Sequence, residues 1–593
     1  MKKALLLGAA VMVAAQYTNA ELTPSKIDDV QFTCISSDGK MAGSDLMGQI
    51  TLINPQNGQV LYNYPETEAD MTAYTLSNGN GQGISNTGVV LCTRNDGDVC
   101  WWKAGEFHSL VPLVTEDAVS NGVNGITPDG LTICGYCGLK PMSTDDSLTP
   151  MSVPVIYKLK SDGTYTEAIQ LPYPERDFTG RIPQYVIATN ISDDGRVIAG
   201  QVLDYSGIMP QPILWKLKDN DTWEYETLGT DLLNPDNVEF PPFPDIEPRQ
   251  PQAPNFMSAD GLAEYNEAYQ AWAASGYTGE MPEYTDYMTE EELAAYNAAM
   301  AKYEADMAIY QPQADAFNEV WYAFLEAGKG TIFVFNSTSL SADGKLLMQM
   351  EQKDIPNPDP NAWFPTVTRF GAAVFNLENG KYKSYGVEQN NQPSQILGDG
   401  TVIGSVQDEM LGTRRATIYG PADWNSDAAP EFGWLDEYLK TQNTEIYNWM
   451  KANMCANFEV EDWEGNVTSY ENVWYTGVPL ATPDMNTIVS TQENTFDWES
   501  EAMTFGFCMP LRDASGIRDV AGEGSMTVRA QRGGLLELQG AGDVKVYDAQ
   551  GRLVYSATGA TGVNGSVNTG LKGVCIVRAT GMDGDVRTLK VNF

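Results

Sequence analysis

The chain has 593 residues and a formal net charge of −43, from 79 acidic and 36 basic residues. This charge argues against nucleic acid or an anionic membrane as a partner, because the chain repels phosphate groups. The only histidine, His108, excludes an HExxH motif and any site with several histidine ligands. A Ser-His-Asp triad would have to use His108, and no Gly-x-Ser-x-Gly motif is present. We therefore expect His108 to be an exposed structural residue.

Residues 1–20 have the pattern of a secretory signal peptide. Lys2 and Lys3 precede an apolar run from Ala4 to Ala15, and small or polar residues follow up to Ala20. The run is too short for a stable membrane anchor. We expect cleavage after Ala20, and a mature chain that is exported and has no transmembrane segment.

A motif recurs between residues 25 and 510. It contains Ser or Thr, one variable residue, Asp and Gly, and an apolar β stretch follows it. Asp-Gly favours a tight turn, because Gly adopts positive φ and Asp bonds its own backbone. Repeated units of about four strands are typical of β-propeller blades, so seven copies predict seven blades, with six or eight as alternatives. Strong and weaker copies lie at residues 36–39, 84–88, 126–130, 191–195, 340–344, 396–400 and 481–485.

The clearest copy runs from Asn190 to Gly200 and reads Asn-Ile-Ser-Asp-Asp-Gly-Arg-Val-Ile-Ala-Gly. The strand that follows ends in Ile213-Leu214-Trp215. In these features the chain resembles the HAF-type extracellular repeats. The resemblance implies a propeller and implies no catalytic activity.

Residues 237–330 interrupt the repeats and predict an α-helical insertion. A Pro-rich entry at 241–254 leads to helical periodicity, and Thr289 is a candidate cap for an acidic first turn. The insertion has 17 acidic and 3 basic residues, a net charge of −14. We interpret its apolar stripe as the seam of a helical hairpin or small bundle, with an aromatic glycan-binding platform as the alternative. The stripe is Leu293, Tyr296, Met300, Tyr303, Met307 and Tyr310, and a third segment carries Phe317, Trp321 and Phe324.

Eight cysteines in an exported chain allow disulfides. Cys92 and Cys100 flank a turn signal and would lie close enough to bridge. Cys134 and Cys137 form a CxxC motif on a repeat strand, where core packing or a local bridge is favoured over a redox site. The segment 219–221 is only a fragment of a calcium-binding loop.

The C-terminal residues 526–593 differ in composition, with 8 bases and 5 acids. We predict a linker at 511–525 and a small β-sandwich at 526–593. The segments 544–548 (Val-Lys-Val-Tyr-Asp), 551–554 (Gly-Arg-Leu-Val) and 571–578 (Leu-Lys-Gly-Val-Cys-Ile-Val-Arg) resemble the type A C-terminal sorting domain of type IX secretion. The resemblance implies the type IX machinery as a partner and a secreted or outer-membrane-surface location in a Gram-negative bacterium.

These observations predict a β-propeller over residues 25–510 that binds a protein or glycan. We expect no catalysis, no cofactor and no metal, and no residue is assigned a catalytic or ligand-binding role. One alternative is a polysaccharide hydrolase or lyase with paired carboxylates in the propeller mouth. Another is a structural cell-envelope protein that oligomerises through the helical insertion.

Overall fold

The structure is a computed structural model that describes residues 22–592, apart from gaps at 47–48, 64–73, 78–80, 95–96, 116–118, 141–149, 205–206, 245–246, 358–363, 409–410, 462–466, 494–503, 512–526, 532–534, 549–551, 569–573 and 582–585. The predicted signal peptide lies outside the described residues, as does the predicted linker apart from residue 511.

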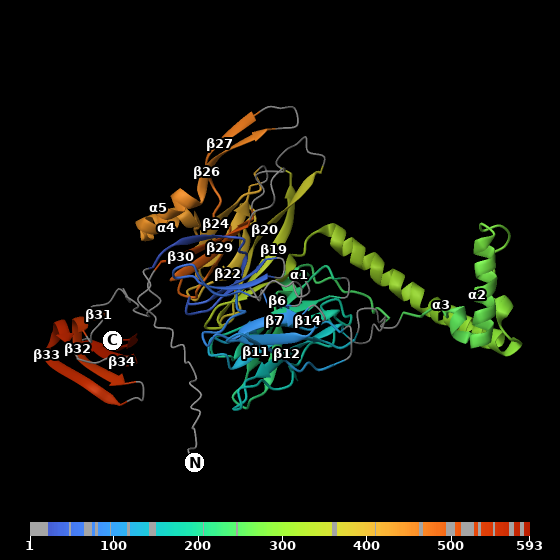
Figure 1. The fold of residues 1–593 in the computed structure, drawn as a ribbon, viewed down its shortest axis with the longest axis horizontal. Helices are drawn as coiled ribbons and strands as arrows, with labels where there is room; N and C mark the ends of the chain where they lie inside the picture. The colour runs from blue at the N-terminus through green and yellow to red at the C-terminus, as the bar shows by residue number, and fades with distance from the viewer. Residues whose placement is uncertain are drawn as a thin grey trace, which may run out of the picture. The chain divides into compact units, whose positions relative to one another are not determined.

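Four-stranded antiparallel meanders, the unit from which propeller blades are built, recur along the chain (Figure 1). One sheet contains β2 (Phe32–Ile35), β3 (Ala42–Leu46), β4 (Gln49–Asn54) and β5 (Gln59–Asn63), and the next contains β6 (Tyr74–Leu76), β7 (Val90–Arg94), β8 (Val99–Lys103) and β9 (Glu106–Ser109).

An eight-stranded sheet follows, and a single parallel pair, Ser152 with Tyr185, joins its two four-stranded halves. One half contains β10 (Gly122–Ile126), β11 (Thr132–Gly138), β12 (Ser152–Lys158) and β13 (Ile169–Gln170). The other contains β14 (Tyr185–Ile191), β15 (Val197–Leu203), β16 (Gln211–Leu217) and β17 (Trp223–Thr227).

Three more sheets complete this part of the chain. They are β18 (Ile332–Leu340), β19 (Leu346–Pro356), β20 (Thr366–Asn376) and β21 (Tyr382–Tyr385); β22 (Gln392–Ile396), β23 (Val402–Gln407), β24 (Arg414–Tyr419) and β25 (Phe432–Trp434); and β28 (Val478–Ala481), β29 (Thr487–Glu493) and β30 (Thr504–Pro510). The last sheet takes its outer strand from the N-terminal end of the described chain, where β1 (Ser25–Asp28) pairs with β30.

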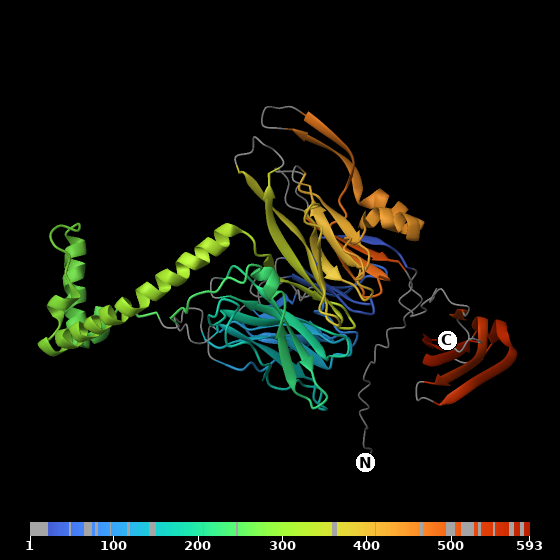
Figure 2. The same ribbon diagram turned by 180° about the vertical axis from the view of Figure 1, so that it is seen from behind.

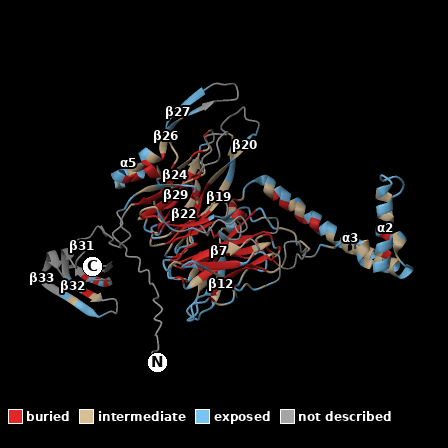
Figure 3. Cartoon of the chain, viewed as in Figure 1, coloured by how far each residue is buried: buried red, intermediate tan, exposed pale blue. Residues whose placement is uncertain are grey.

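The chain divides into two compact units. One contains residues 1–90, 397–422 and 430–593, and the other contains residues 91–396 and 423–429. Each has its own apolar core. Buried residues, red in Figure 3, lie along the strands of both units. Phe507, Ile403 and Val489 are among the fully buried side chains of the first unit, and Trp215 and Ile156 are among those of the second.

Helices occupy the predicted insertion: the 3₁₀ helices η1 (Ala253–Phe256) and η2 (Tyr284–Tyr287), α2 (Ala259–Ala274) and α3 (Glu290–Ala327). The short α1 (Thr230–Leu233) precedes the insertion. The helix α3 has 38 residues, a length of about 57 Å. Its first turn carries a capping box, in which Glu292 Oε2 accepts from Thr289 N (2.8 Å) and Thr289 Oγ1 accepts from Glu292 N (3.3 Å). Figure 2 shows α3 leading from the sheets of its own unit to α2.

The periodicity of residues 289–324 predicts two helical segments, and the structure has one helix. It continues through Pro312, whose side chain is exposed. Aromatic side chains on the following turns are buried against the rest of the unit, which holds the helix together where proline removes one backbone hydrogen bond.

Further elements follow β25: the helices α4 (Leu435–Gln442) and α5 (Thr444–Asn453), and the hairpin of β26 (Cys455–Glu461) and β27 (Val467–Trp474).

The C-terminal strands form one five-stranded antiparallel sheet where the sequence predicts a sandwich. The first part of β32 pairs with β31 and its last part with β34, while β33 runs along both parts. Bulges interrupt the pairing of β32 with β33, so the exchange of partners takes place within one long strand. The strands are β31 (Thr527–Gln531), β32 (Leu535–Asp548), β33 (Leu553–Asn568), β34 (Val574–Gly581) and β35 (Val586–Asn592).

Candidate functional site

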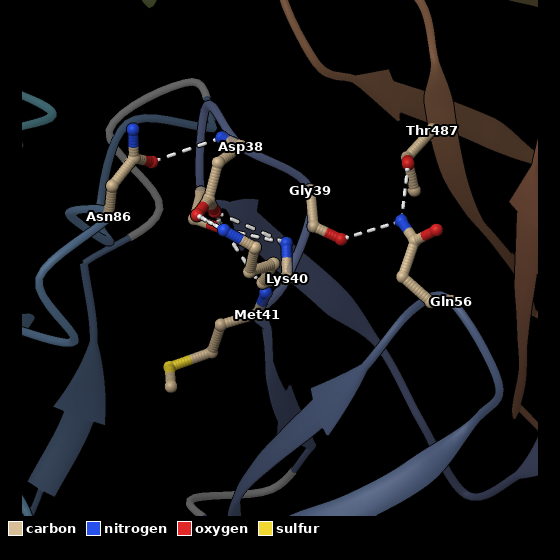
Figure 4. A network of polar contacts seen from close by, with 8 residues as sticks. Asp38, Gly39, Lys40, Met41, Gln56, Asn86 and Thr487 are labelled. Carbon is tan, nitrogen blue, oxygen red and sulfur yellow. Dashed lines mark hydrogen bonds and ion pairs between the residues drawn. The ribbon is translucent and has the colours of Figure 1, made fainter. Parts of the chain in front are cut away.

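The repeated motif forms a hydrogen-bonded turn between the first and second strands of a sheet. In the first copy Ser36 Oγ donates to Asp38 Oδ1 (2.8 Å) and accepts from Met41 N (3.0 Å), and Gly39 has a φ of 65° (Figure 4). The motif aspartates are therefore committed to the turn. The same hydroxyl-to-carboxylate bond measures 2.6–2.8 Å in Thr127–Asp129, Ser192–Asp194, Ser341–Asp343 and Thr482–Asp484.

In the first copy the motif glycine also packs closely against a neighbouring sheet. A Cβ at Gly39 would lie 2.7 Å from Thr487 Oγ1. Gln56 Nε2 donates to Gly39 O (2.8 Å) and to Thr487 Oγ1 (2.7 Å), as Figure 4 shows. In the last copy Met485 occupies the glycine position with a φ of 56°. These contacts give the motif a structural role.

Asp193 differs from the motif aspartates because it occupies the variable position. Its backbone N donates to Ala342 O (2.8 Å). The residue as a whole is exposed, but partial burial of its carboxyl group, followed by the charges of Asp194, Asp343 and Asp129, raises the pKa of Asp193 to about 6. Among the described carboxyl groups with a resolved pKa shift, this is the only one raised. A carboxyl group with this pKa is a candidate general acid, provided that a second catalytic group lies within reach.

His108 and the segment 219–221, for which the sequence allows a functional role, lie in a strand and a turn. His108 lies on β9, stacked on Trp101 (ring centroids 4.2 Å apart), and its side chain is 41% exposed. The segment 219–221 is the turn after β16, where Asp219 Oδ1 pairs with Arg196 Nη2 (3.1 Å). In the described part of the chain, no group of three or more His, Cys, Asp or Glu residues is arranged to hold a metal ion.

None of the eight cysteines forms a disulfide in the structure. Cys92 and Cys100 lie on β7 and β8 without the bridge that their spacing allows, and Cys100 Sγ lies 3.5 Å from Cys92 O. Cys134 and Cys137 lie buried on β11, also unbridged. Burial raises the pKa of Cys134 to about 12, so its reactive thiolate form is suppressed at neutral pH.

The last turns of α3, which we call the base of α3, are packed against the second unit by aromatic side chains. Phe317, Trp321 and Phe324 are buried on one face of the helix. The Trp321 ring lies 6.4 Å from Phe178 and 5.9 Å from Phe240, between ring centroids. The last three turns of α3 are therefore fixed by aromatic packing to the segments before β14 and after α1.

A buried arginine completes this base. The Arg181 guanidinium lies 3.3 Å from the Phe243 ring centroid and 5.1 Å from that of Phe317, within the range of a cation–π interaction. Asp177 Oδ1 accepts from Thr179 N (2.8 Å) and Arg181 N (3.1 Å), which closes the loop that presents the arginine. Sequence reasoning missed this loop, because it lies outside the insertion and has no periodic pattern.

The two ends of the insertion meet at one place. Thr331 N donates to Leu232 O (2.8 Å), and a Cβ at Gly330 would lie 2.3 Å from Leu233 O. Residues 234–329 therefore leave the sheets and return to the same point.

The predicted seam on α3 packs against η1 and the Pro-rich entry. The helix α2 packs against η2, where Tyr265 stacks on Tyr284 (3.8 Å between centroids). The α3 stripe is half-buried, and two of its residues contact the segment that precedes α2: Tyr296 meets Phe256 of η1 (5.6 Å), and Tyr310 meets Phe243 of the Pro-rich entry (6.0 Å). The stripe is thus covered, as the predicted seam requires, but the regular spacing of apolar residues could not show which segment covers it. Two rings of the alternative glycan-binding platform, Tyr296 and Tyr310, contact other rings of the chain.

No helix among the described residues combines the length and apolarity needed to cross a membrane. Neither a protein-family model nor a curated protein matches the sequence. Structural similarity extends to the Dos1 propeller (9% identity, TM-score 0.34, covering 83% of this chain and 97% of that one) and the polysaccharide lyase Uly1 (7%, 0.36, 83% and 100%). A putative TolB from Agrobacterium tumefaciens is also similar (12%, 0.26, 60% and 80%). Because these TM-scores are below 0.5, we transfer no function from these proteins.

Proposed function

We propose that this chain is a seven-bladed β-propeller, exported by type IX secretion, that acts as a binding protein at the surface of a Gram-negative bacterium. The four-stranded meanders support the blade count, with the eight-stranded sheet taken as two blades. The pairing of β1 with β30 supports a ring closed by its two ends. The sequence resemblance of residues 526–593 supports the sorting role.

The observation that carries the binding role is the rigid base of α3. A helix of 38 residues that is fixed at one end by buried aromatic rings is a suitable scaffold for presenting a recognition surface. The motif aspartates and buried thiols have structural roles, which favours binding over catalysis.

Glycan and host-protein arrays probed with the mature chain test this proposal. A matched variant would replace residues 244–312 with a short Gly-Ser linker, so that Phe243 and Phe317, whose rings are 5.0 Å apart, remain in place. We expect a specific ligand for the mature chain. Absence of any ligand on both arrays would refute the binding role.

The carboxylate-enzyme alternative has one observation in its favour, the raised pKa of Asp193. Its test is a screen of polysaccharides for released sugar, with Asp193→Asn as the control. Turnover that disappears in this variant would establish the alternative, and turnover unchanged in it would remove Asp193 from consideration.

The sorting role has a separate test. Deletion of residues 526–593 should leave the protein in the periplasm of a type IX-competent host. Surface delivery of this shortened chain would refute the role.

A further inference from the structure

The outer face of α3 has a different character from the buried face. Asp315, Glu319, Tyr322 and Glu326 follow one another at intervals of four, three and four residues, so they lie on the same side of the helix. All four are exposed, and the Tyr322 side chain is 66% exposed. Asp315 accepts from Gln311 Nε2 (2.8 Å) on the preceding turn. We call these four residues the outer face of α3.

This face is rigid because of what lies behind it. Phe317, Trp321 and Phe324 occupy the same turns and are buried against the unit. Side chains on a helix that is already fixed lose little backbone entropy when they bind a partner. The outer face is therefore preorganised.

Its negative charge is not neutralised nearby. Two of the three basic residues of the insertion form ion pairs elsewhere, Lys302 with Asp306 and Lys329 with Asp236 (2.6 Å). In the described part of the chain, no ion pair is found for Asp315, Glu319 or Glu326. A partner that supplies positive charge would gain these interactions.

The negative charge of the outer face distinguishes between two possible partners, a second copy of this chain and a basic protein. A second copy would bring another insertion with a net charge of −14 against the first, and like charges in an interface are unfavourable. A basic partner is attracted. Arginine suits this face in particular, because its guanidinium stacks on tyrosine and forms two parallel hydrogen bonds with a carboxylate.

Building on the proposed binding role, we propose that the outer face of α3 docks an arginine-rich segment of another protein. Tyr322 is the central stacking residue, and Asp315, Glu319 and Glu326 pair with guanidinium groups. Because the face is small, we expect micromolar affinity for an isolated segment, on the order of −8 kcal/mol.

The test titrates the mature chain with a helical Arg/Ala peptide of about twenty residues, long enough to fold, at physiological salt. Tyr322→Ala should weaken binding about tenfold. The triple variant Asp315→Asn/Glu319→Gln/Glu326→Gln should weaken it further. A control triple, Glu167→Gln/Glu388→Gln/Asp427→Asn, removes the same charge from exposed positions of the same unit and should bind like the wild type.

Tyr322→Glu separates docking from general attraction. It adds negative charge, so attraction by charge alone predicts tighter binding of the peptide, whereas docking on the tyrosine predicts weaker binding. Tighter binding, or equal loss in the two triple variants, would overturn the proposal. A dimer in light scattering that the outer-face triple abolishes would also overturn it, in favour of a second copy. If an array ligand binds the mature chain and the outer-face triple equally well, this inference fails while the binding role stands.

Discussion

Trp321→Ala should release α3 from its base. The Trp321 side chain is 5% exposed and contacts the rings of Phe240 (5.9 Å), Phe324 (5.7 Å) and Phe178 (6.4 Å). A tryptophan buries about 150–250 Å², which at about 25 cal/mol per Å² contributes about 4–6 kcal/mol. Measured truncations of this kind cost about 3–5 kcal/mol, because the cavity relaxes only in part. This is comparable to the stability of a whole domain, about 5–15 kcal/mol.

Limited proteolysis is the direct assay. In the wild type the last turns of α3 should resist cleavage, and in Trp321→Ala they should become the first site cut, at a rate raised by at least about a hundredfold. Tyr322→Ala is the matched control, because this neighbouring aromatic side chain is 66% exposed and its loss should change stability by no more than about 0.5 kcal/mol. Unchanged protection in Trp321→Ala, or equal cleavage in both variants, would refute the role assigned to the aromatic base.

Three other outcomes follow from the turns and the core. The folded pKa of Asp193, about 6, lies above the ordinary 3.8, so the native state holds the proton more tightly and stability falls as pH rises from about 4 to 6; Asp193→Asn should remove this fall in urea unfolding. Because Asp193 is exposed to solvent, we expect the free energy of unfolding to fall by about 1 kcal/mol over this pH range, less than the roughly 3 kcal/mol expected for an enclosed group. Identical pH profiles for the wild type and Asp193→Asn would contradict the raised pKa of Asp193. Ser341→Ala should destabilise by about 1–3 kcal/mol, because Ser341 Oγ accepts from Leu346 N (2.9 Å) and Lys345 N (3.2 Å); the exposed Ser161→Ala should be neutral, and equal midpoints would contradict the turn assignment. Cys134 should resist alkylation by iodoacetamide at pH 8 until urea unfolds the chain, since burial raises its pKa; rapid labelling of the native protein would show that the thiol is accessible.

The turns were predictable because their physics is local. Ser341, Asp343 and Gly344 lie within four positions of one another, and the bonds that form the turn connect residues that the sequence also places together. The weak copy ending in Met485 was recognisable for the same reason, since Thr482 and Asp484 keep the hydrogen bond although the glycine is lost. Local chemistry could not predict which sheets each turn contacts, such as Gly39 against Thr487.

In the helical insertion, the periodicity of apolar residues predicts which helix face is covered but not which residues cover it. The spacing of Phe317, Trp321 and Phe324 is that of one helix face, and the structure buries this face. Two of the partners, Phe178 and Arg181, lie more than 130 positions earlier and precede β14. No pattern in either segment refers to the other, so their contact appears only when the sheets bring them together.

The proposed binding surface lies where a buried and an exposed aromatic residue follow one another on α3. Trp321 and Tyr322 are adjacent aromatic residues, one 5% and the other 66% exposed. As neighbours on an α-helix they point about 100° apart, but exposure alone does not distinguish a solvated tyrosine from a binding residue. The distinction comes from the buried aromatic base, which makes the outer face rigid, and from the acids on either side of Tyr322, which select a basic partner. Binding of the arginine-rich peptide should require both the rigid base and the acidic residues. If Trp321→Ala releases α3, the peptide should therefore bind more weakly to this variant, although Trp321 is not part of the outer face.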